Sequence, residues 1–344
     1  MWTNLSKPII GLAPMDGITD AAFRETVDLI SKPNILFTEF VPAEGVAHGA
    51  TRLYSSLQKH KTTTPIVAQL FGVDPKAFYK AAVIVLELGF DGIDINMGCP
   101  DRNIMKKGGG ASLINQRVLA ATIIKAVKQA VKDWQNGKTL KSLSLRDEAF
   151  GWIERNKPLK VDRTYKPVSI KTRTGINQHD TVPWISTLLE VEPDAICIHA
   201  RTFLQMYKGK ADWDEIAKAS LLTKGTNTLL FGNGDLNSVS QAKAHCKMYR
   251  CQGALIGRAA LGNPWVFTNK SPLLSERFGT MLKHSKLYLK YRQKLKLFPM
   301  RKHLAWYCTG FAGSRILRDK LMKIESLVEL KKLLIDFLNQ PLKT

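Results

Sequence analysis

The chain alternates short apolar runs with longer segments in which apolar residues recur every three or four positions. Eight runs have the length of β-strands and consist mainly of consecutive Val, Ile, Leu and Ala residues, with little alternation of apolar and polar side chains. Strands of this composition are buried on both faces, as in parallel sheets. The runs cover residues 8–13, 35–39, 65–70, 92–96, 167–171, 195–199, 228–231 and 253–256.

Most of the segments between these runs have helical spacing. They cover residues 19–30, 75–88, 113–132, 181–189, 212–219 and 237–248. Thr19, Asp74 and Asn237 belong to the residue types that cap helix N-termini. Eight strands over about 260 residues match a (β/α)8 TIM barrel better than an open doubly wound sheet, which usually has fewer strands. The pattern therefore predicts an α/β fold with a closed parallel barrel over residues 1–265.

One connection is too long for such a barrel. Residues 133–166 are polar and charged around a short apolar piece at residues 149–153, whereas barrel connections usually have about 2 to 6 residues. We expect an insertion on the outside of the barrel, which is either a surface loop or a segment that binds a partner.

The pattern changes after Trp265, where strand-like runs end and Leu- and Lys-rich helical stretches follow, such as residues 281–297 and 326–338. This predicts a small all-α domain over residues 270–344, with 17 Lys and Arg against 5 Asp and Glu. Basic residues, Lys290 and Arg292 among them, alternate there with Leu, Tyr and Phe. Any one such run is explained by a solvated helix face, but a bias of the whole domain favours a phosphate-binding surface.

The whole chain of 344 residues carries a net charge of +22, which favours a polyanionic partner, either nucleic acid or an anionic membrane. No stretch approaches about 20 uninterrupted apolar residues, and the first residues lack the pattern of a signal peptide. We therefore expect nucleic acid as the partner, no membrane and a cytoplasmic location. The five cysteines include no CxxC pair, so they suggest neither a disulfide framework nor a zinc site, and we expect no metal.

Chemistry in a barrel gathers at the carboxyl ends of the strands, and here these ends carry polar residues. Asn233-Gly234-Asp235 follows the seventh run, and Gly257-Arg258 follows the eighth. The loops after strands seven and eight commonly bind phosphate in barrels. Alone, the first segment is equally explained as a plain turn, but the two together predict a site for a phosphorylated cofactor.

In their order along the chain, the strand-end segments resemble those of the tRNA-dihydrouridine synthases, flavin enzymes with a barrel followed by a helical tRNA-binding domain. The segment of residues 301–326 also resembles the helical domain of the bacterial members. The resemblance covers nearly the whole chain and rests on residues 13–15 (APM) with 19–20 (TD), 96–100 (NMGCP), 171–175 (KTRTG), 199–202 (HART), 233–235 (NGD), and 257–259 (GRA) with 262–265 (GNPW).

The resemblance implies FMN at the barrel mouth, its reduction by NADPH, and hydride transfer to C6 of a uracil in tRNA. Cys99 matches the general acid that protonates C5. A thiol with a reference pKa of about 8.5 is still protonated at neutral pH, so it can donate where a carboxyl group is already ionised. Most cysteines of this kind are small core residues. We apply that interpretation to Cys197, inside a strand, but not to Cys99, in a Gly-Cys-Pro turn beyond a strand end.

The resemblance also assigns residues to the cofactor. Lys171 matches a lysine that would stabilise the anionic reduced flavin, although a structural ion pair would also explain it. His199 matches a histidine near flavin and substrate, although many lone histidines are core residues. The remaining implied cofactor contacts are Gln69 at the flavin ring, Pro14, Met15 and Asp16 alongside it, and Asn233, Gly234, Asp235, Gly257 and Arg258 at the ribityl phosphate.

Five residues are expected to serve the tRNA. Asn96 and Arg201 either touch the uracil or hold neighbouring residues in place, Arg102 contacts the tRNA backbone near Cys99, and Lys290 and Arg292 bind phosphates. Four features depart from the family pattern. Asp16 replaces a small residue, and Arg102 is the one clear cation in a segment usually rich in lysine. Residues 107–110 (KGGG) match the pattern only loosely, and the insertion has no counterpart.

Two other functions compete with this interpretation. A related barrel flavoenzyme could reduce a free pyrimidine, but such a substrate would leave the charge of the helical domain with nothing to bind. A tRNA-binding protein without catalysis would not require Cys99, Lys171 and His199 together.

Overall fold

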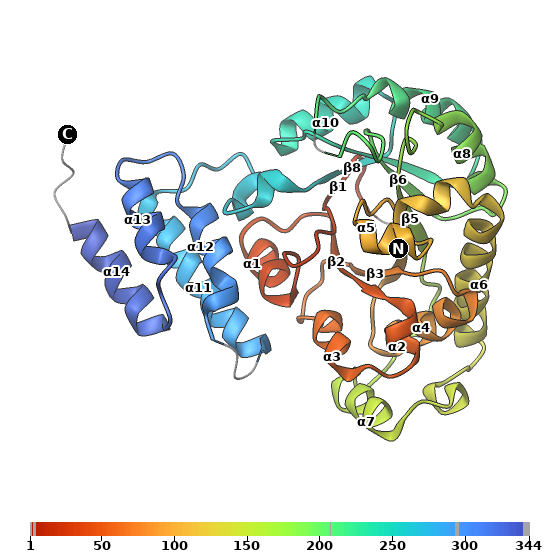
Figure 1. Cartoon of the computed structure of the whole chain (residues 1–344), viewed down its shortest axis with the longest axis horizontal. Helices are drawn as coiled ribbons and strands as arrows, with labels where there is room; N and C mark the ends of the chain where they lie inside the picture. The colour runs from red at the N-terminus through yellow and green to blue at the C-terminus, as the bar shows by residue number, and fades with distance from the viewer. Residues whose placement is uncertain (1, 3–4, 207, 293–295, 340–344) are drawn as a thin grey trace.

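The protein consists of a closed barrel and a helical bundle beside it (Figure 1). The computed structural model describes residues 2, 5–206, 208–292 and 296–339. All eight strands are parallel and pair in sequence order, and β8 closes the barrel against β1. The predicted TIM barrel is thereby confirmed. The strands are β1 (Ile9–Leu12), β2 (Ile35–Pro42), β3 (Ile66–Phe71), β4 (Gly92–Met97), β5 (Val168–Arg173), β6 (Ala195–His199), β7 (Leu229–Asn233) and β8 (Gly253–Ile256).

Apolar side chains fill both faces of the strands, as the continuous runs predict. One cluster, which includes Ile9, Phe37, Val67 and Phe231, packs inside the barrel. A second and larger cluster lies between the strands and the surrounding helices. The barrel helices are α1 (Ala21–Ser31), α2 (Ala43–Ala47), α3 (Thr51–Tyr54), α4 (Pro75–Glu87), α5 (Arg102–Lys106), α6 (Arg117–Gln135), α7 (Asp147–Asn156), α8 (Thr181–Leu189), α9 (Asp214–Thr223) and α10 (Val239–Met248).

The helix starts follow local capping chemistry. Asp74 caps α4 as predicted, and its carboxylate accepts from the Lys76 N–H. The prediction of Thr19 as a cap was wrong, because its hydroxyl bonds the backbone of Met15 in the turn before the helix, and Asp20 caps α1 instead. At α10 the cap is Ser238, one residue after the expected Asn237.

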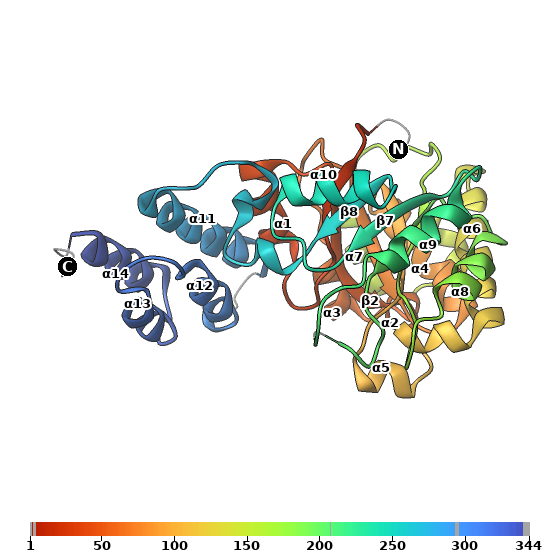
Figure 2. The ribbon, with the colours of Figure 1, turned by 90° about the horizontal axis from the view of Figure 1, so that it is seen from above.

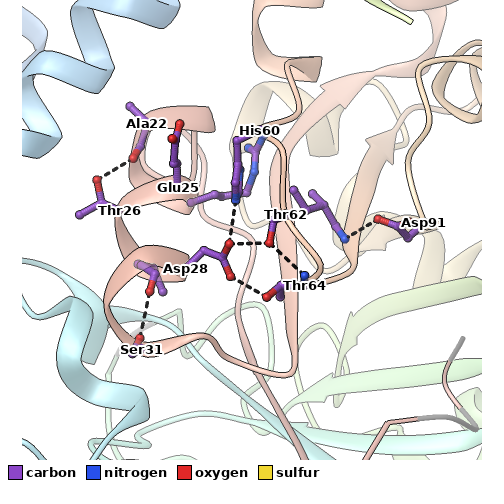
Figure 3. Close-up of polar contacts among 12 residues, drawn as sticks. Ala22, Glu25, Thr26, Asp28, Ser31, His60, Thr62, Thr64 and Asp91 are labelled. Atoms are coloured by element: carbon purple, nitrogen blue, oxygen red, sulfur yellow. Dashed lines mark hydrogen bonds and ion pairs between the residues drawn. The ribbon is translucent and has the colours of Figure 1, made fainter. Parts of the chain in front are cut away.

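A buried polar cluster ties α1 to the segment that enters β3 (Figure 3). The Asp28 carboxylate accepts from the hydroxyls of Thr62 and Thr64, both at 2.5 Å, and lies 3.3 Å from His60 Nε2. Burial raises the pKa of Asp28, but these hydrogen bonds outweigh it and lower the pKa below its usual value. The cluster therefore holds the carboxylate ionised and fixes the strand entrance against the helix.

The insertion is a folded element. Residues 133–135 still belong to α6, the short 3-10 turn η4 covers Leu140–Leu143, and α7 follows. Ala149 and Ile153 are the buried residues of α7. The ring of Trp152 lies 5.1 Å from that of Tyr54, and Glu148 accepts from the Thr51 hydroxyl. The insertion therefore packs on α3 as a helix.

The C-terminal part is helical, as predicted. Its helices are α11 (Leu274–Arg292), α12 (Arg301–Tyr307), α13 (Ser314–Leu321) and α14 (Leu327–Asn339). They enclose a separate apolar cluster that Trp265 and Ala22 join from the barrel side. The helix expected over 281–297 begins earlier, at Leu274, and ends at Arg292, while residues 293–295 lie outside the described residues.

The bundle projects from one side of the barrel, beyond α1 (Figure 2). The Tyr291 hydroxyl donates to Glu25 at 2.5 Å, and the Lys302 ammonium donates to the Gly17 carbonyl. Gly17 lies in the loop after β1, so the bundle reaches the carboxyl ends of the strands. Within the described ranges, no helix combines the length and apolar character needed to span a bilayer.

Candidate functional site

A pocket of about 830 Å³ opens at the carboxyl ends of the strands. Residues at or just beyond the carboxyl ends of all eight strands line it, because a closed parallel barrel brings these ends to one rim. Of the predicted site residues, those that line the pocket are Pro14, Met15, Asp16, Gln69, Asn96, Cys99, Lys171, His199, Asn233, Gly234, Asp235, Gly257 and Arg258.

Cys99 lies in a turn that Asn96 shapes. The Asn96 side-chain oxygen accepts the N–H groups of Gly98 at 3.0 Å and of Cys99 at 2.9 Å. Cys99 belongs to the pocket wall, and the residue is only 7% exposed. Burial raises its pKa, and the carboxylates of Asp101 and Asp16 raise it further. Cys99 is therefore held as a protonated thiol at neutral pH, in reach of a pocket ligand.

A chain of buried polar groups supports this turn from inside the barrel. The side-chain NH₂ group of Asn96 donates to the side-chain oxygen Oε1 of Gln69 at 3.0 Å. The side-chain NH₂ group of Gln69 in turn donates to the Asp94 carboxylate at 2.6 Å. Ser169 donates to the other Asp94 oxygen at 2.5 Å. Burial raises the pKa of Asp94 to about 6, although Gln69 and Ser169 favour the ionised form. This chain fixes which amide atoms Gln69 and Asn96 present to the pocket.

Asp94 was missed by the sequence reasoning. The sequence feature that could have revealed Asp94 is its position two residues before Asn96 inside a strand. Side chains two positions apart in a strand point to the same face, so Asp94 lies on the face of Asn96. Arg173, within the quoted KTR segment, also lines the pocket. Its guanidinium donates to the carbonyls of Gly98 at 2.8 Å and Thr202 at 3.0 Å, so it joins the ends of β4, β5 and β6.

Lys171 and His199 share one wall of the pocket. The Lys171 ammonium donates to the Asn233 side chain at 3.2 Å, and no carboxylate of the described residues is paired with it. Burial lowers the pKa of Lys171. Burial also lowers the pKa of His199 well below its usual value, and the positive charges of Lys171 and Arg173 add to this effect. This wall therefore presents a buried amine beside an imidazole whose neutral form is favoured.

The loops after β7 and β8 form the adjoining part of the rim. Gly234 has φ +131°, and a Cβ there would lie 2.7 Å from the Ala211 Cβ and 3.3 Å from the His199 ring, so only glycine fits. Asp235 accepts from Arg201 at 2.6 Å and Arg258 at 2.9 Å. Burial opposes ionisation of Asp235, but the bond from Arg201 prevails and lowers its pKa. Asp235 thus orients Arg258, whose side chain is 53% exposed, at this rim.

Four predicted substrate residues lie outside the pocket lining. Arg201 is buried and bonds Asp235, the Gly209 carbonyl and His199 Nε2, which agrees with its alternative role of holding neighbours. Arg102 is exposed on α5. Lys290 is exposed on α11, with its ammonium 5.3 Å from the centre of the Tyr291 ring. Arg292 instead contacts the barrel, where it donates to Ser55 at 2.9 Å and lies 3.6 Å from Glu39.

Three potential metal ligands meet beside the β5 and β6 ends. Ligand atoms of His179, Asp212 and Glu215 all lie within 4.8 Å of one another. Glu215 already pairs with Lys218 and accepts from the Thr181 hydroxyl, and His179 bonds Thr174. These contacts account for the group as a polar cluster, and the expectation of no metal stays a prediction.

Comparison with known proteins places this site in a family. A sequence model described as "Dihydrouridine synthase (Dus)" matches residues 11–142 and 159–341. A probable tRNA-dihydrouridine synthase of Staphylococcus aureus (strain MRSA252) is 31% identical over 346 residues, covering 98% of this chain and 95% of that protein. A probable tRNA-dihydrouridine synthase 2 of Bacillus subtilis (strain 168) is 30% identical, covering 98% of this chain and 96% of that protein.

A solved structure of similar fold is that of DHODH from Eimeria tenella in complex with ferulenol. It superposes with a TM-score of 0.50 at 12% sequence identity, over 75% of this chain and 78% of that one. This similarity supports the barrel fold.

Proposed function

Because the chain belongs to the dihydrouridine synthase family, we propose that it reduces a uridine of tRNA to dihydrouridine with a bound flavin. The observation that carries the proposal is the juxtaposition in one barrel-mouth pocket of a protonated thiol, Cys99, and an ammonium without a carboxylate partner, Lys171. The first can donate a proton, and the second can stabilise an anion.

The pocket fits FMN in size and chemistry. Its volume of about 830 Å³ falls within the range of roughly 300–1,000 Å³ typical of cofactor sites. Lys171 would neutralise the negative charge of the reduced ring system. Gln69 and Asn96, fixed by Asp94, would offer amide groups to its polar edge. Asn233, Gly234 and Gly257, with the Arg258 that Asp235 orients, would hold the ribityl phosphate after β7 and β8.

The chemistry of the chain's own residues follows from this placement. A bound reduced flavin supplies the hydride that adds to C6 of the uracil. Negative charge then develops at C5 and the C4 oxygen, so Cys99 donates its proton to C5 as general acid. The neutral His199 can donate a hydrogen bond to a uracil carbonyl without adding charge. The raised pKa of Cys99 favours its reprotonation after each turnover.

The helical bundle supports tRNA rather than a free pyrimidine as the substrate. The segment 270–344 carries a net charge of +12, and Lys302 brings it to the rim of the pocket through the Gly17 carbonyl. A basic bundle at the rim can hold RNA phosphates while one nucleotide enters the pocket. We propose residues 270–344 as the tRNA-binding domain and NADPH as the reductant of the flavin.

The test uses purified full-length protein. Denaturation should release a yellow chromophore with the absorbance and mass of FMN. Incubation with unmodified transfer RNA and NADPH should then add two hydrogens to one uridine, as detected by mass spectrometry of nuclease digests. The same reaction with NADH measures the coenzyme preference. Release of flavin without tRNA product, but with reduction of free uracil, would support the small-molecule alternative. A colourless protein that binds tRNA would support the non-catalytic one.

A further inference from the structure

A second cleft, of about 440 Å³, lies between the insertion helix α7 and the C-terminal end of α11. In Figure 1, α7 lies with α3 at the lower edge of the barrel. We call this the α7–α11 cleft, and it is lined by Ser55, Gln58, Trp152, Arg155, Asn156, Tyr291 and Arg292. Its walls thus come from the insertion, from the connection between β2 and β3, and from the basic bundle.

The insertion wall of this cleft lies outside the part of the chain that the family model matches. The family match leaves out residues 143–158, a stretch that contains all of α7. Packing of Trp152 on Tyr54, together with the burial of Ala149 and Ile153, fixes α7 on the barrel. The remaining surface of Trp152 and the side chain of Arg155, one turn further on, therefore face the cleft from a rigid support.

The cleft presents two cations and two aromatic rings. Arg155 is exposed, and no hydrogen bond or ion pair to its guanidinium occurs among the described residues. Arg292 is oriented by Ser55 and lies 3.6 Å from Glu39. Tyr291 is held by the bond from its hydroxyl to Glu25. Arginine with an aromatic side chain is the combination that recognises a phosphate together with its ribose or base.

The charge of Arg292 is only partly neutralised at the barrel. Burial and the nearby carboxylate of Asp20 raise the pKa of Glu39 to about 7. Near neutral pH this carboxyl group is therefore ionised in only part of the molecules, and it also faces Arg24. Cationic character remains on the cleft side of Arg292.

The α7–α11 cleft and the barrel mouth flank the same segment of chain. Asp20 lies just after the loop that follows β1, and the positive charges of Arg292 and Lys302 both act to lower its pKa. Lys302 in turn contacts Gly17, next to Asp16 of the pocket rim. A polyanion seated at the mouth and along the bundle therefore passes close to the cleft.

We propose that the α7–α11 cleft is an additional binding site for the tRNA substrate, in which Arg155 and Arg292 hold one backbone phosphate and Trp152 and Tyr291 contact its nucleotide. This proposal rests on the proposed function. It assigns to the insertion a role in extending the tRNA interface beyond the residues that the family model matches.

Arg155 is the residue to test, because Arg292 also joins the bundle to the barrel. The variants are Arg155→Glu, the conservative Arg155→Lys, and Arg146→Glu as a matched control. Arg146 is an exposed arginine directly before the first residue of α7 and does not line the cleft. Both charge reversals change the net charge equally, so they affect long-range attraction alike.

Affinity of the full-length flavin-loaded protein for an unmodified tRNA transcript is measured over a series of KCl concentrations. Arg155→Glu should weaken binding about five- to ten-fold at 0.1 M salt and lower the salt slope by about 1, as expected for one lost phosphate contact. Arg155→Lys should bind within about three-fold of the parent, because it keeps a cation. Hydroxyl-radical footprinting should show one short stretch of tRNA backbone that loses protection in Arg155→Glu alone.

Equal affinities and footprints for Arg155→Glu and Arg146→Glu would overturn the proposal. If the parent still forms dihydrouridine in that case, the proposed function stands and only the cleft assignment fails. If the parent neither binds nor reduces tRNA, both fail together.

Discussion

At the scale of single residues, the surroundings of each titratable side chain in the pocket determine whether it carries a proton. Cys99 is kept protonated by burial and by nearby carboxylates, and His199 is kept neutral by burial and by nearby cations. A proton donor and an uncharged hydrogen-bonding group therefore lie in the same pocket as the amine of Lys171. This division suits the proposed reaction, because the proton and the stabilising charge come from different side chains.

Replacement of Cys99 by Ala should remove the proton donor and leave the pocket intact. Loss of a general acid usually costs about 10²–10⁴ in rate, so dihydrouridine formation in single-turnover assays should fall by a factor in that range. Flavin content and tRNA affinity should stay at the parent values, since the Asn96 bonds involve only the backbone at position 99. An undiminished yield of dihydrouridine would show that another group protonates C5.

The dependence of the single-turnover rate on pH should also reflect the protonation of Cys99. A thiol with a raised pKa remains protonated through neutral pH and loses its proton only above its ordinary range. The single-turnover rate should therefore be level from about pH 7 to 8.5 as far as this group is concerned, and should decline at more alkaline pH. The decline should be absent from the residual rate of Cys99→Ala. A decline that begins near pH 6 in the parent would contradict the assignment.

At the scale of elements, polar clusters decide how strands and loops are held. The chain from Ser169 through Asp94, Gln69 and Asn96 holds the turn after β4. Outside the barrel, Asp28 of α1 holds the segment that enters β3 through His60, Thr62 and Thr64. A buried carboxylate with several donors stabilises such a connection, because removal of the acceptor leaves every donor unsatisfied.

Replacement of Asp28 by Ala should lower the free energy of unfolding by about 2–4 kcal/mol, because two hydroxyls and an imidazole lose their acceptor in a buried place. Urea denaturation followed by circular dichroism measures this change. Thr64→Val removes a single donor and should cost only about 1 kcal/mol.

Acid dependence provides a check on the same cluster. The pKa of Asp28 in the folded protein lies below its unfolded value. Its contribution is therefore complete above about pH 4–5 and is lost as the pH falls through the folded pKa. The difference in stability between the parent and Asp28→Ala should shrink over that acidic range. A difference that grows on acidification would mean that the carboxyl group is not ionised in the folded state.

At the scale of the whole molecule, a basic bundle is attached to the side of a barrel close to its mouth. Tyr291, Arg292 and Lys302 join the two bodies through Glu25, Ser55 and Gly17. The attachment leaves other cations of the bundle, such as Lys290, exposed to solvent. The tRNA surface that we propose therefore extends from the pocket rim along α11 and α12.

Charge reversal at Lys290 should weaken tRNA binding by about five-fold at 0.1 M salt and reduce the salt slope by about 1. The physical reason is the loss of one cation from the exposed side of α11. Lys243→Glu on α10 is the matched control, since it is an exposed lysine on a barrel helix outside the pocket and the bundle. Equal effects of the two substitutions would show that only net charge matters and that Lys290 makes no local contact.

The sequence alone was sufficient for the eight strands, most of the helices and part of the set of residues around the pocket. The reason is that continuous apolar runs, helical periodicity and strand-end motifs are properties of residues close together in the chain. A closed parallel barrel then leaves one place for all the carboxyl ends. Thirteen of the predicted site residues consequently meet in the pocket.

Only the tertiary structure showed different surroundings for charged residues that occupy similar positions in the sequence. Lys290 and Arg292 stand two positions apart in one basic run, yet the first is exposed and the second contacts the barrel. Arg201 and Arg258 both follow strand ends, yet the first is buried behind Asp235 and the second reaches the rim. The role of a charged side chain depends on partners that arrive from distant parts of the chain, and no local pattern records those partners.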